Sequence, residues 1–390
     1  MKILLSAYAC EPNKGSEPEI AWSWIKFLSK KNENKIFVIT REKNKKKIDK
    51  YKFNNVTFLY YDLPNFLMNL IKRKKNSKTY LYFWLWQFGI FFRYYKFINK
   101  QNFDFIHHLT FVTYRFPSFL SLCNSKFIFG PVAGGETVPK KLLNKFSLKY
   151  YFEEKIRHLS NMVIKISPLL NLTFFKSKKI FLTTNECLNF IPKYFHKKCL
   201  IMPAISNGNI KYVIRNKIKT KNIYFSGRLV EWKGIHILLL VLQKINKIDK
   251  NIKLNVFGDG YYNFKIKKFI KQNKLQKNII LHGHLKQNLL FKKIKNNDLL
   301  IFPTLRDSGG YVIIEALNNN IDVMTTNSGG PDTIIKSSSI PKVNVRNKPT
   351  KDIVNSFVNL ILKYYKNYNV NKYYLNKYLN LNNKFNEIYK

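Results

Sequence analysis

The sequence predicts an α/β protein built from two Rossmann-like domains, each with a doubly wound parallel sheet. Short apolar runs alternate with helical stretches along most of the chain, which is the pattern of repeated βαβ units. Several runs are apolar on both faces, as strands between two layers of helices must be. The pattern restarts near residue 222 after a polar, basic and turn-rich segment. A chain of 390 residues is also long enough for two ordinary domains.

Eleven strands are expected from these runs. The first half contains KILLSAY (2–8), KIFVIT (35–40), VTFLYYDL (56–63), FDFIHHLT (103–110), KFIFGPV (126–132) and KKIFLTT (178–184). The second half contains NIYFSGRL (222–229), KLNVFGDG (253–260), NIILHGHL (278–285), LLIFPT (299–304) and IDVMTT (321–326). In parallel sheets of this kind, ligands bind beyond the carboxyl ends of the strands, often against a helix N-terminus. The two sheets are therefore expected to face a shared cleft with those ends.

The domain boundaries follow from the same pattern. We expect a first domain over residues 1–205, a linker over 206–221 and a second domain over 222–350. Residues 351–390 are basic, rich in tyrosine and free of glycine, and they predict a helical tail that packs back toward the first domain.

Charge is the most unusual feature of the composition. Lys and Arg total 69 against 22 Asp and Glu, a formal net charge of +47. Such a surface attracts anions: nucleic acid, acidic lipid or a phosphate-bearing substrate. The Lys, Asn and Ile excess also has the character of an AT-rich genome, to which we assign about half of the basic surplus. Patterns of RNA-recognition, KH or zinc modules are absent from the sequence, so no specific nucleic acid is expected.

Cysteine usage and hydropathy bear on location. The four cysteines, at 10, 123, 187 and 199, are far apart and form no CxxC pair. They predict reduced thiols in a cytoplasmic protein, with neither a disulfide framework nor a zinc site. The apolar N-terminus is too short for a signal peptide, and no run approaches 18 apolar residues.

The stretch FSGRLVEWKG (225–234) contains the first candidate site residues. A strand ends near Phe225, Gly227 lets the backbone turn closely, and Arg228 and Lys233 project from the loop before a helix. Two fixed cations beside a helix N-terminus suit a diphosphate, and Arg can bind its oxygens in a bidentate way. A solvated loop in a lysine-rich chain is the structural alternative.

The stretch NVFGDGYY (255–262) is a weaker indication. Gly258 and Gly260 follow a strand, but a lone GxG is more often a tight turn than a nucleotide site. It gains weight only because the same domain holds the neighbouring motifs.

The stretch RDSGGYVIIEALNNN (306–320) places two acids on either side of a glycine turn. Gly309 and Gly310 leave room for phosphate oxygens to reach the N–H groups of the helix that follows. Glu315, one turn inside that helix, is placed to accept hydrogen bonds from ribose hydroxyls, and Asp307 to reach a sugar. As the structural alternative, Asp307 or Ser308 caps the helix.

Together these residues resemble a known family. SGRLVEWKG, FGDG and RDSGGYVIIEAL, followed by TTNSGGP, resemble the C-terminal half of a family 4 glycosyltransferase of GT-B fold. That family marks its donor site with two acids separated by seven residues, the spacing of Asp307 and Glu315. In the first half, SAYACEPNKGSEPEIAW, HHLTFVTYRFPSF and FGPVAGGE resemble a bacterial subgroup of the same family.

The resemblance implies a role for each residue. Arg228 and Lys233 would hold the donor diphosphate, Glu315 the ribose and Asp307 the transferred sugar. The residues expected to border the donor are Gly15, Gly227, Gly258, Gly260, Ser308, Gly309 and Gly310. On the acceptor side the resemblance places Gly134, Gly135 and Glu136, with His107 or His108. We interpret the two histidines as mainly structural, His108 being the better candidate for catalysis.

The implied reaction is transfer of a sugar, with retention, from a nucleotide-diphosphate sugar to an acceptor hydroxyl, in cell-surface polysaccharide or glycolipid synthesis. Cations and helix N–H groups would stabilise the departing diphosphate, so neither a metal nor a cofactor is expected. Asp307 is one methylene shorter than the Glu usual in the family, and Asn320-Ile321-Asp322 replaces a Gly-x-Pro turn. A relative that binds the donor with weakened catalysis, or a basic nucleic-acid-binding protein, are the alternatives.

A possible membrane contact lies in residues 71–95. The basic run IKRKKNSK precedes TYLYFWLWQFGIFFRYY, and lysines beside Trp and Phe suit an interface with anionic lipid. The alternative is a core helix packed on the first sheet. A saccharide or lipid-linked acceptor and a peripheral position on the inner face of the plasma membrane are the corresponding expectations.

Overall fold

The computed structural model describes residues 1–72, 78–206, 220–285, 289–290, 293–294, 298–335, 340–367 and 375–390. These divide into two compact units: residues 1–135, 159–206 and 377–390 form the first, and 136–158 and 207–376 the second. Most of the predicted linker and the centre of the basic run at 71–78 lie outside the described residues. Among the described helices, none is both long and apolar enough to cross a membrane.

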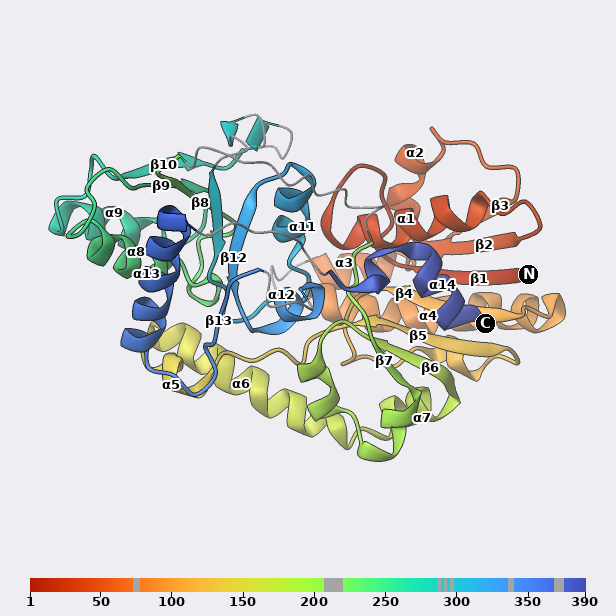
Figure 1. Ribbon diagram of the computed structural model, residues 1–390. Helices are drawn as coiled ribbons and strands as arrows, with labels where there is room; N and C mark the ends of the chain where they lie inside the picture. Colours follow the sequence, from red (N-terminus) through yellow and green to blue (C-terminus); the bar gives the residue numbers. More distant parts are fainter. Residues whose placement is uncertain are drawn as a thin grey trace. The chain divides into compact units, whose positions relative to one another are not determined.

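The first unit is built on a seven-stranded parallel sheet in the order β3-β2-β1-β4-β5-β6-β7 (Figure 1). Its strands are β1 (Lys2–Ala7), β2 (Lys35–Thr40), β3 (Val56–Tyr60), β4 (Phe105–Thr110), β5 (Lys126–Val132), β6 (Ser177–Leu182) and β7 (Cys199–Ile201). The α-helices that lie wholly in it are α1 (Ser16–Ser29), α2 (Lys45–Ile48), α3 (Asn65–Lys72), α4 (Lys78–Gln101), α7 (Pro168–Lys176) and α14 (Leu381–Tyr389).

The second unit has a six-stranded parallel sheet in the order β10-β9-β8-β11-β12-β13. Its strands are β8 (Asn222–Ser226), β9 (Lys253–Phe257), β10 (Ile279–Gly283), β11 (Leu299–Phe302), β12 (Asp322–Thr326) and β13 (Lys342–Val343). The helices are α5 (Lys140–Leu143), α8 (Ile235–Ile245), α9 (Asn263–Gln272), α11 (Tyr311–Asn318), α12 (Gly329–Ile334) and α13 (Thr350–Asn367). Figure 1 shows α8 and α13 on one side of this sheet and α11 and α12 on the other.

The predicted fold class is confirmed, and each of the eleven expected strands is present. In β4 and β12 every residue is buried, which agrees with strands covered by helices on both faces. The short strands β7 and β13 were not predicted. The first eleven residues of the long helix α6 (Leu148–Lys165) and all of α5 lie in a region assigned above to the first domain, but residues 136–158 belong to the second unit. Val138, Leu142 and Phe146 are buried in the hydrophobic core of that unit.

Residues 377–390 complete the first unit from the far end of the chain. Lys384 on α14 is fully buried, and its ammonium donates hydrogen bonds to the carbonyl oxygens of Pro203 at 2.5 Å and Ile205 at 2.7 Å, and to Ser206 Oγ at 2.7 Å. Three oxygens replace the water that this ammonium loses. Burial nevertheless lowers the pKa of Lys384 well below its usual range.

The last helix is also fixed to the sheet through Tyr389. The Tyr389 hydroxyl lies 2.5 Å from His107 Nδ1, and His107 Nε2 lies 2.7 Å from the carbonyl oxygen of Gly130. A carbonyl can only accept, so Nε2 carries the proton and Nδ1 accepts from the tyrosine. Burial lowers the pKa of His107 to about 3, although the bond to Gly130 opposes the shift. His107 is therefore neutral and structural in this unit.

Tyr389→Phe should lower the free energy of unfolding of the first unit by about 1–2 kcal/mol, because it leaves His107 Nδ1 buried without a donor. Urea titration followed by far-UV circular dichroism measures the change. Tyr194→Phe, at a side chain that is 65% exposed, is the matched control and should change stability little. Equal midpoints for both variants and the wild type would contradict the structural role of this bond.

Candidate functional site

The loops after β8 and β11 lie next to each other because these strands are neighbours in the second sheet. Lys233, in the turn after β8, forms an ion pair with Asp307, in the turn after β11, and both side chains are largely buried. The Lys233 ammonium also lies 5.1 Å from the centre of the Phe302 ring. The ion pair thus joins two of the segments that the sequence analysis selected.

The Asp307 carboxylate also shapes its own turn. Asp307 Oδ1 accepts hydrogen bonds from the N–H groups of Gly309 at 2.9 Å and Gly310 at 3.3 Å. Burial alone would raise the pKa of Asp307, but the Lys233 ammonium and these N–H groups outweigh it and hold the pKa below its ordinary range. The carboxylate is therefore charged, and two N–H groups expected to face phosphate point at Asp307 instead.

The helix α11 starts at this turn and contains Glu315. Gly310 precedes the helix with a left-handed φ of 62°. Glu315 is half-buried, and burial raises the pKa of its carboxyl group. Burial is the cause of this shift, and among the described residues neither a charge nor a hydrogen bond opposes it. The two acids thus differ: the neighbours of Asp307 keep it charged, whereas burial favours the protonated form of Glu315.

The other predicted donor residues lie in the same set of loops. Arg228 is exposed, with its guanidinium 6.0 Å from the centre of the Trp232 ring. Gly258 and Gly260 pack their backbones against the loop after β8: a Cβ at Gly258 would lie 1.9 Å from the carbonyl oxygen of Gly227, and one at Gly260 2.4 Å from that of Leu229. These glycines hold the loops together, as the tight-turn interpretation predicts.

Ser308 lies between the turn of Asp307 and the start of α12. A Cβ at Gly330 would lie 2.8 Å from the backbone of Ser308, and the Gly330 N–H donates to the carbonyl oxygen of Asp307 at 2.7 Å. Asn320, at the start of the tripeptide that replaces the family's Gly-x-Pro turn, has a left-handed φ of 56°, which asparagine tolerates. Backbone contacts therefore position the loop after β11 against the SGGP segment.

Several residues next to these loops had no signal in the sequence. Arg306 pairs with Glu154 of α6 at 2.6 Å, and its guanidinium lies 4.7 Å from the centre of the Trp232 ring. Glu231 is almost completely buried and accepts hydrogen bonds from the Ser147 N–H at 3.0 Å and from Lys265 at 3.1 Å. These contacts depend on α6, whose place in the second unit the strand pattern does not reveal.

The predicted residues of the first unit lie at the ends of its strands. Gly15 has a left-handed φ of 68°, and a Cβ there would meet open space. Gly134 accepts hydrogen bonds at its carbonyl oxygen from Arg115 at 2.6 Å and Asn161 at 3.1 Å. Gly135 packs against the backbone of Cys187, with 2.6 Å between a Cβ built there and Cys187 Cα. Glu136 is buried and belongs to the second unit, where it lies 3.8 Å from Arg157.

His108 is buried at the end of β4. His108 Nε2 lies 3.3 Å from the carbonyl oxygen of Phe111, while Nδ1 has no hydrogen-bond partner within the described part of the chain. Burial lowers the pKa of His108 to about 4, with the bond to Phe111 opposing. It is neutral near pH 7, so any proton it moved in catalysis would require access to Nδ1.

Glu17 is a titratable group beside Gly15 that the sequence analysis did not select. It lies in the first turn of α1 and accepts a hydrogen bond from the N–H of Val112, in the loop after β4. Burial raises the pKa of Glu17 to about 7, although the N–H bond opposes the shift. Both segments of this contact, GSE and HHLTFV, belong to the stretches that resemble the family. Their sequences alone do not indicate that the fold brings Glu17 next to Val112.

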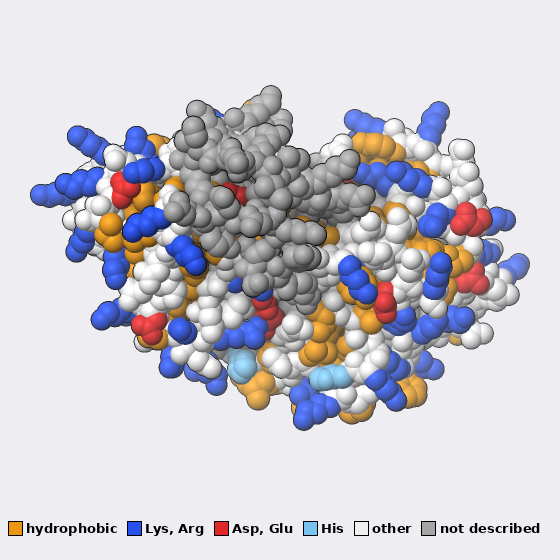
Figure 2. Space-filling model, viewed as in Figure 1, with side chains coloured by type: hydrophobic (Ala, Val, Ile, Leu, Met, Phe, Trp, Pro, Cys, Tyr) orange, Lys and Arg blue, Asp and Glu red, His pale blue; other side chains and the backbone are white. Residues whose placement is uncertain are grey.

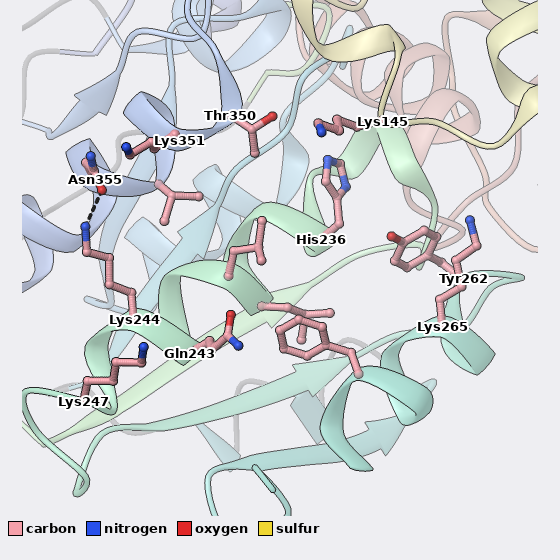
Figure 3. A pocket seen from close by; sticks show the side chains of 14 residues that line it. Lys145, His236, Gln243, Lys244, Lys247, Tyr262, Lys265, Thr350, Lys351 and Asn355 are labelled. Atoms are coloured by element: carbon pink, nitrogen blue, oxygen red, sulfur yellow. Dashed lines mark hydrogen bonds between the residues drawn. The ribbon is translucent and has the colours of Figure 1, made fainter. Parts of the chain in front are cut away.

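A cavity in the second unit is separate from these residues. It has a volume of about 740 Å³ and lies between α8, α9 and the start of α13 (Figure 3). Lysines 145, 244, 247, 265 and 351 surround an apolar floor that includes Leu239 and Phe269. Arg228, Lys233, Asp307 and Glu315 do not line it. Among the described residues, no three His, Cys, Asp or Glu side chains gather as a metal site would require.

Part of the chain matches a known family of proteins. Residues 209–374 match the model of the family "Glycosyl transferases group 1". The capsular polysaccharide biosynthesis glycosyltransferase CapM of Staphylococcus aureus is 33% identical over 122 residues, which are 30% of this chain and 31% of that protein. The chain spans between 31% and 41% of the length of three curated relatives that it matches.

Solved structures match over nearly the whole chain. The lipopolysaccharide outer core galactosyltransferase WaaB superposes with a TM-score of 0.59 at 12% identity, over 94% of this chain and 92% of that one. The Anabaena protein HepE, in complex with UDP and glucose, gives a TM-score of 0.52 at 13% identity, over 93% and 90%. The protein is thus of GT-B fold. Its second unit contains the segment that matches the group 1 glycosyltransferase model.

Lys233→Met should destabilise the second unit by about 2–4 kcal/mol at pH 7, because it leaves the Asp307 carboxylate buried without its counter-ion. The folded-state pKa of Asp307 is lowered, so the ion pair stabilises above the ordinary pKa of Asp and its contribution is lost as pH falls through the folded value. The difference from wild type should therefore shrink below about pH 4. Urea titrations at several pH values measure it.

Lys221→Met is the control for this variant, since Lys221 pairs with Asp249 at 2.6 Å on the surface. An exposed pair of this kind contributes about 0–1 kcal/mol. A Lys233→Met effect no larger than that of the control would show that the Asp307 carboxylate does not depend on Lys233.

Glu17→Gln should make the protein more stable at pH 8 and leave stability at pH 4.5 unchanged. The raised pKa means that the folded state binds a proton more tightly than the unfolded state, so wild-type stability falls as pH rises from about 4.5 to 7. Gln cannot ionise, so the variant avoids the decrease of about 1–3 kcal/mol in the free energy of unfolding that ionisation of Glu17 causes in the wild type. Thermal melts across this window measure it. Glu19→Gln, in the same helix, is the control, and identical curves for Glu17→Gln and wild type would refute the assignment.

Proposed function

We propose that the protein is a glycosyltransferase that moves a sugar, with retention of configuration, from a nucleoside diphosphate sugar to an acceptor hydroxyl. The observation that carries the proposal is the Lys233–Asp307 ion pair between the loops after β8 and β11. It brings the two predicted donor motifs together at the carboxyl edge of the second sheet, where ligands of such sheets bind. The match of residues 209–374 to group 1 glycosyltransferases supports the same site.

The proposed chemistry depends mainly on electrostatics. Breaking the bond between sugar and diphosphate places negative charge on the departing oxygen, and fixed cations that meet this charge lower the barrier. Arg228 is exposed on the loop and supplies a guanidinium to the diphosphate. Lys233 shares its charge between Asp307 and the diphosphate. Glu315, which is half-buried on α11, accepts hydrogen bonds from the ribose hydroxyls.

The donor and acceptor classes come from the relatives. UDP-sugars are the first donors to test, because HepE was solved with UDP and glucose. CapM acts in capsule synthesis and WaaB on lipopolysaccharide, so we propose a saccharide or lipid-linked acceptor of the cell surface. A cytoplasmic enzyme that meets its acceptor at the inner face of the plasma membrane fits this proposal.

A donor-binding protein with weakened catalysis is the second candidate. The specific observation in its favour is that Asp307 is already occupied by Lys233, Gly309 and Gly310, which leaves this short acid little freedom to reach a sugar. A nucleic-acid-binding protein would instead be expected to gather its cations in one patch. On the face in Figure 2, Lys and Arg side chains are scattered among other side chains.

UDP or a UDP-sugar should raise the melting temperature of the wild type by several degrees at saturating ligand. Glu315→Gln should weaken ligand binding about ten- to a hundred-fold, because it removes a charged acceptor of ribose hydrogen bonds. Glu153→Gln, an exposed acid on α6, is the control and should bind as the wild type does. Isothermal titration with UDP measures both.

Turnover separates the two candidates. Release of UDP from a UDP-sugar, with an anomeric configuration retained in the product by NMR, supports the transferase. Binding that depends on Glu315 without turnover of any sugar donor supports the second candidate. Absence of binding to any nucleotide-sugar would refute both.

A further inference from the structure

The end of α6 and the helix α7 present large apolar side chains to solvent. Between residues 159 and 175, seven large apolar side chains are between 38% and 76% exposed. They are Leu159, Met162, Val163, Ile166, Leu169, Leu172 and Phe175, and we call them the α6–α7 face. Monomeric soluble proteins rarely expose so many neighbouring apolar side chains to water, so we expect this face to bind another surface.

Helical spacing groups these side chains on each helix. Leu159 and Val163 are four residues apart on one side of α6, and Ile166 follows in the turn just after its end. Leu169, Leu172 and Phe175 follow with spacings of three on α7. The opposite side of α6 carries the buried Asn161, which donates to the carbonyl oxygen of Gly134. The helix is thus fixed to the unit by its polar side.

The segment of the chain that contains the face is strongly basic. Residues 159–198 contain seven lysines, at 165, 176, 178, 179, 193, 197 and 198, and a single acid, Glu186. Lys198 lies directly at the face: its ammonium donates to the carbonyl oxygen of Phe175 at 2.7 Å and is 5.7 Å from the centre of the Phe175 ring. Lysines beside exposed apolar side chains combine attraction to anions with burial of apolar area.

We propose that the α6–α7 face binds the surface of an anionic phospholipid bilayer. The apolar side chains enter the boundary between headgroups and acyl chains, and the lysines meet the phosphate groups. A second copy of this chain would bring two strongly basic surfaces together, which like-charge repulsion opposes. An anionic bilayer matches both the apolar side chains and the lysines, because it has an apolar interior below negatively charged headgroups.

This surface differs from the segment at 71–95 that the sequence suggested. In α4, the side chains of Tyr82, Phe83, Trp86 and Ile90 are buried in the core of the first unit, and Tyr80, Leu81, Phe92 and Tyr95 are its exposed large hydrophobic residues. The larger exposed apolar surface belongs to α6 and α7, which the sequence analysis did not select. The proposal stands independently of glycosyl transfer, since vesicle binding requires no sugar donor.

Co-sedimentation with vesicles tests the proposal. The wild type should bind vesicles of phosphatidylcholine with about 30% phosphatidylglycerol, and bind pure phosphatidylcholine at least ten-fold more weakly. Val163→Glu/Ile166→Glu should lower the partition coefficient on the anionic vesicles at least ten-fold, since two side chains lose their apolar contact with lipid. Both side chains are already exposed, so circular dichroism should show an unchanged melting temperature.

A matched variant separates loss of apolar contact from loss of charge. Ile248→Glu/Phe264→Glu adds the same two negative charges at side chains that are 61% and 75% exposed in the second unit, close to the 57% and 76% of Val163 and Ile166. It should retain binding within about three-fold. Equal losses in the two double variants would mean that net charge alone drives binding, and would overturn the proposal.

A fluorescent probe reports directly on the contact. An NBD group on Ile166→Cys, in a Cys199→Ser background, should shift its emission to the blue on anionic vesicles, whereas the same group on Ile248→Cys should not. The other three native cysteines are buried. Absence of a shift at 166 would refute contact with lipid. Vesicle-independent dimers that dissociate in Val163→Glu/Ile166→Glu would instead assign the face to a second copy, and would also refute the proposal.

Discussion

The arrangement of the second unit's loops depends on the ion pair between Lys233 and Asp307. The two residues come from loops after different strands, so the pair fixes the distance between these loops. The same carboxylate accepts two N–H groups and so sets the turn from which α11 begins. Glu315 has its position because α11 does. The two acids are thus connected through one short turn that the Asp307 carboxylate helps to hold.

The site is consequently charged and partly self-neutralised before any ligand is bound. Lys233 faces an internal carboxylate, whereas Arg228 is exposed on the same loop. Under the proposed function, a diphosphate would first meet the exposed guanidinium of Arg228. It would then compete with the Asp307 carboxylate for the Lys233 ammonium. Such competition lets a site distinguish a highly charged anion from a weakly charged one. Only the highly charged anion is attracted to Lys233 strongly enough to offset the weakening of the Lys233–Asp307 ion pair.

Sequence patterns predicted the sheets well because burial on both faces leaves an unmistakable apolar run. FIHHLT and DVMTT show why composition alone is insufficient: both contain polar residues, yet every one of them is buried. CLI and KV are too short to form a recognisable pattern, so β7 and β13 were missed. The spacing of Asp307 and Glu315 selected them as candidate donor residues, but it did not reveal the partners of Asp307. The same residue types occur whether the carboxylate binds its own turn or a ligand. Arg306 and Glu17 were missed because their partners lie 152 and 95 residues away.

The participation of α14 in the first unit has a consequence for synthesis of the chain. Residues 377–390 supply Lys384 to the carbonyl groups near Pro203 and Tyr389 to His107, yet the whole of residues 207–376 is translated before them. While the ribosome makes the second unit, the His107 imidazole and the three oxygens that later accept from Lys384 therefore remain exposed to water. Completion of the first unit is thus a late event, and the second sheet can form before the first unit receives its last helix.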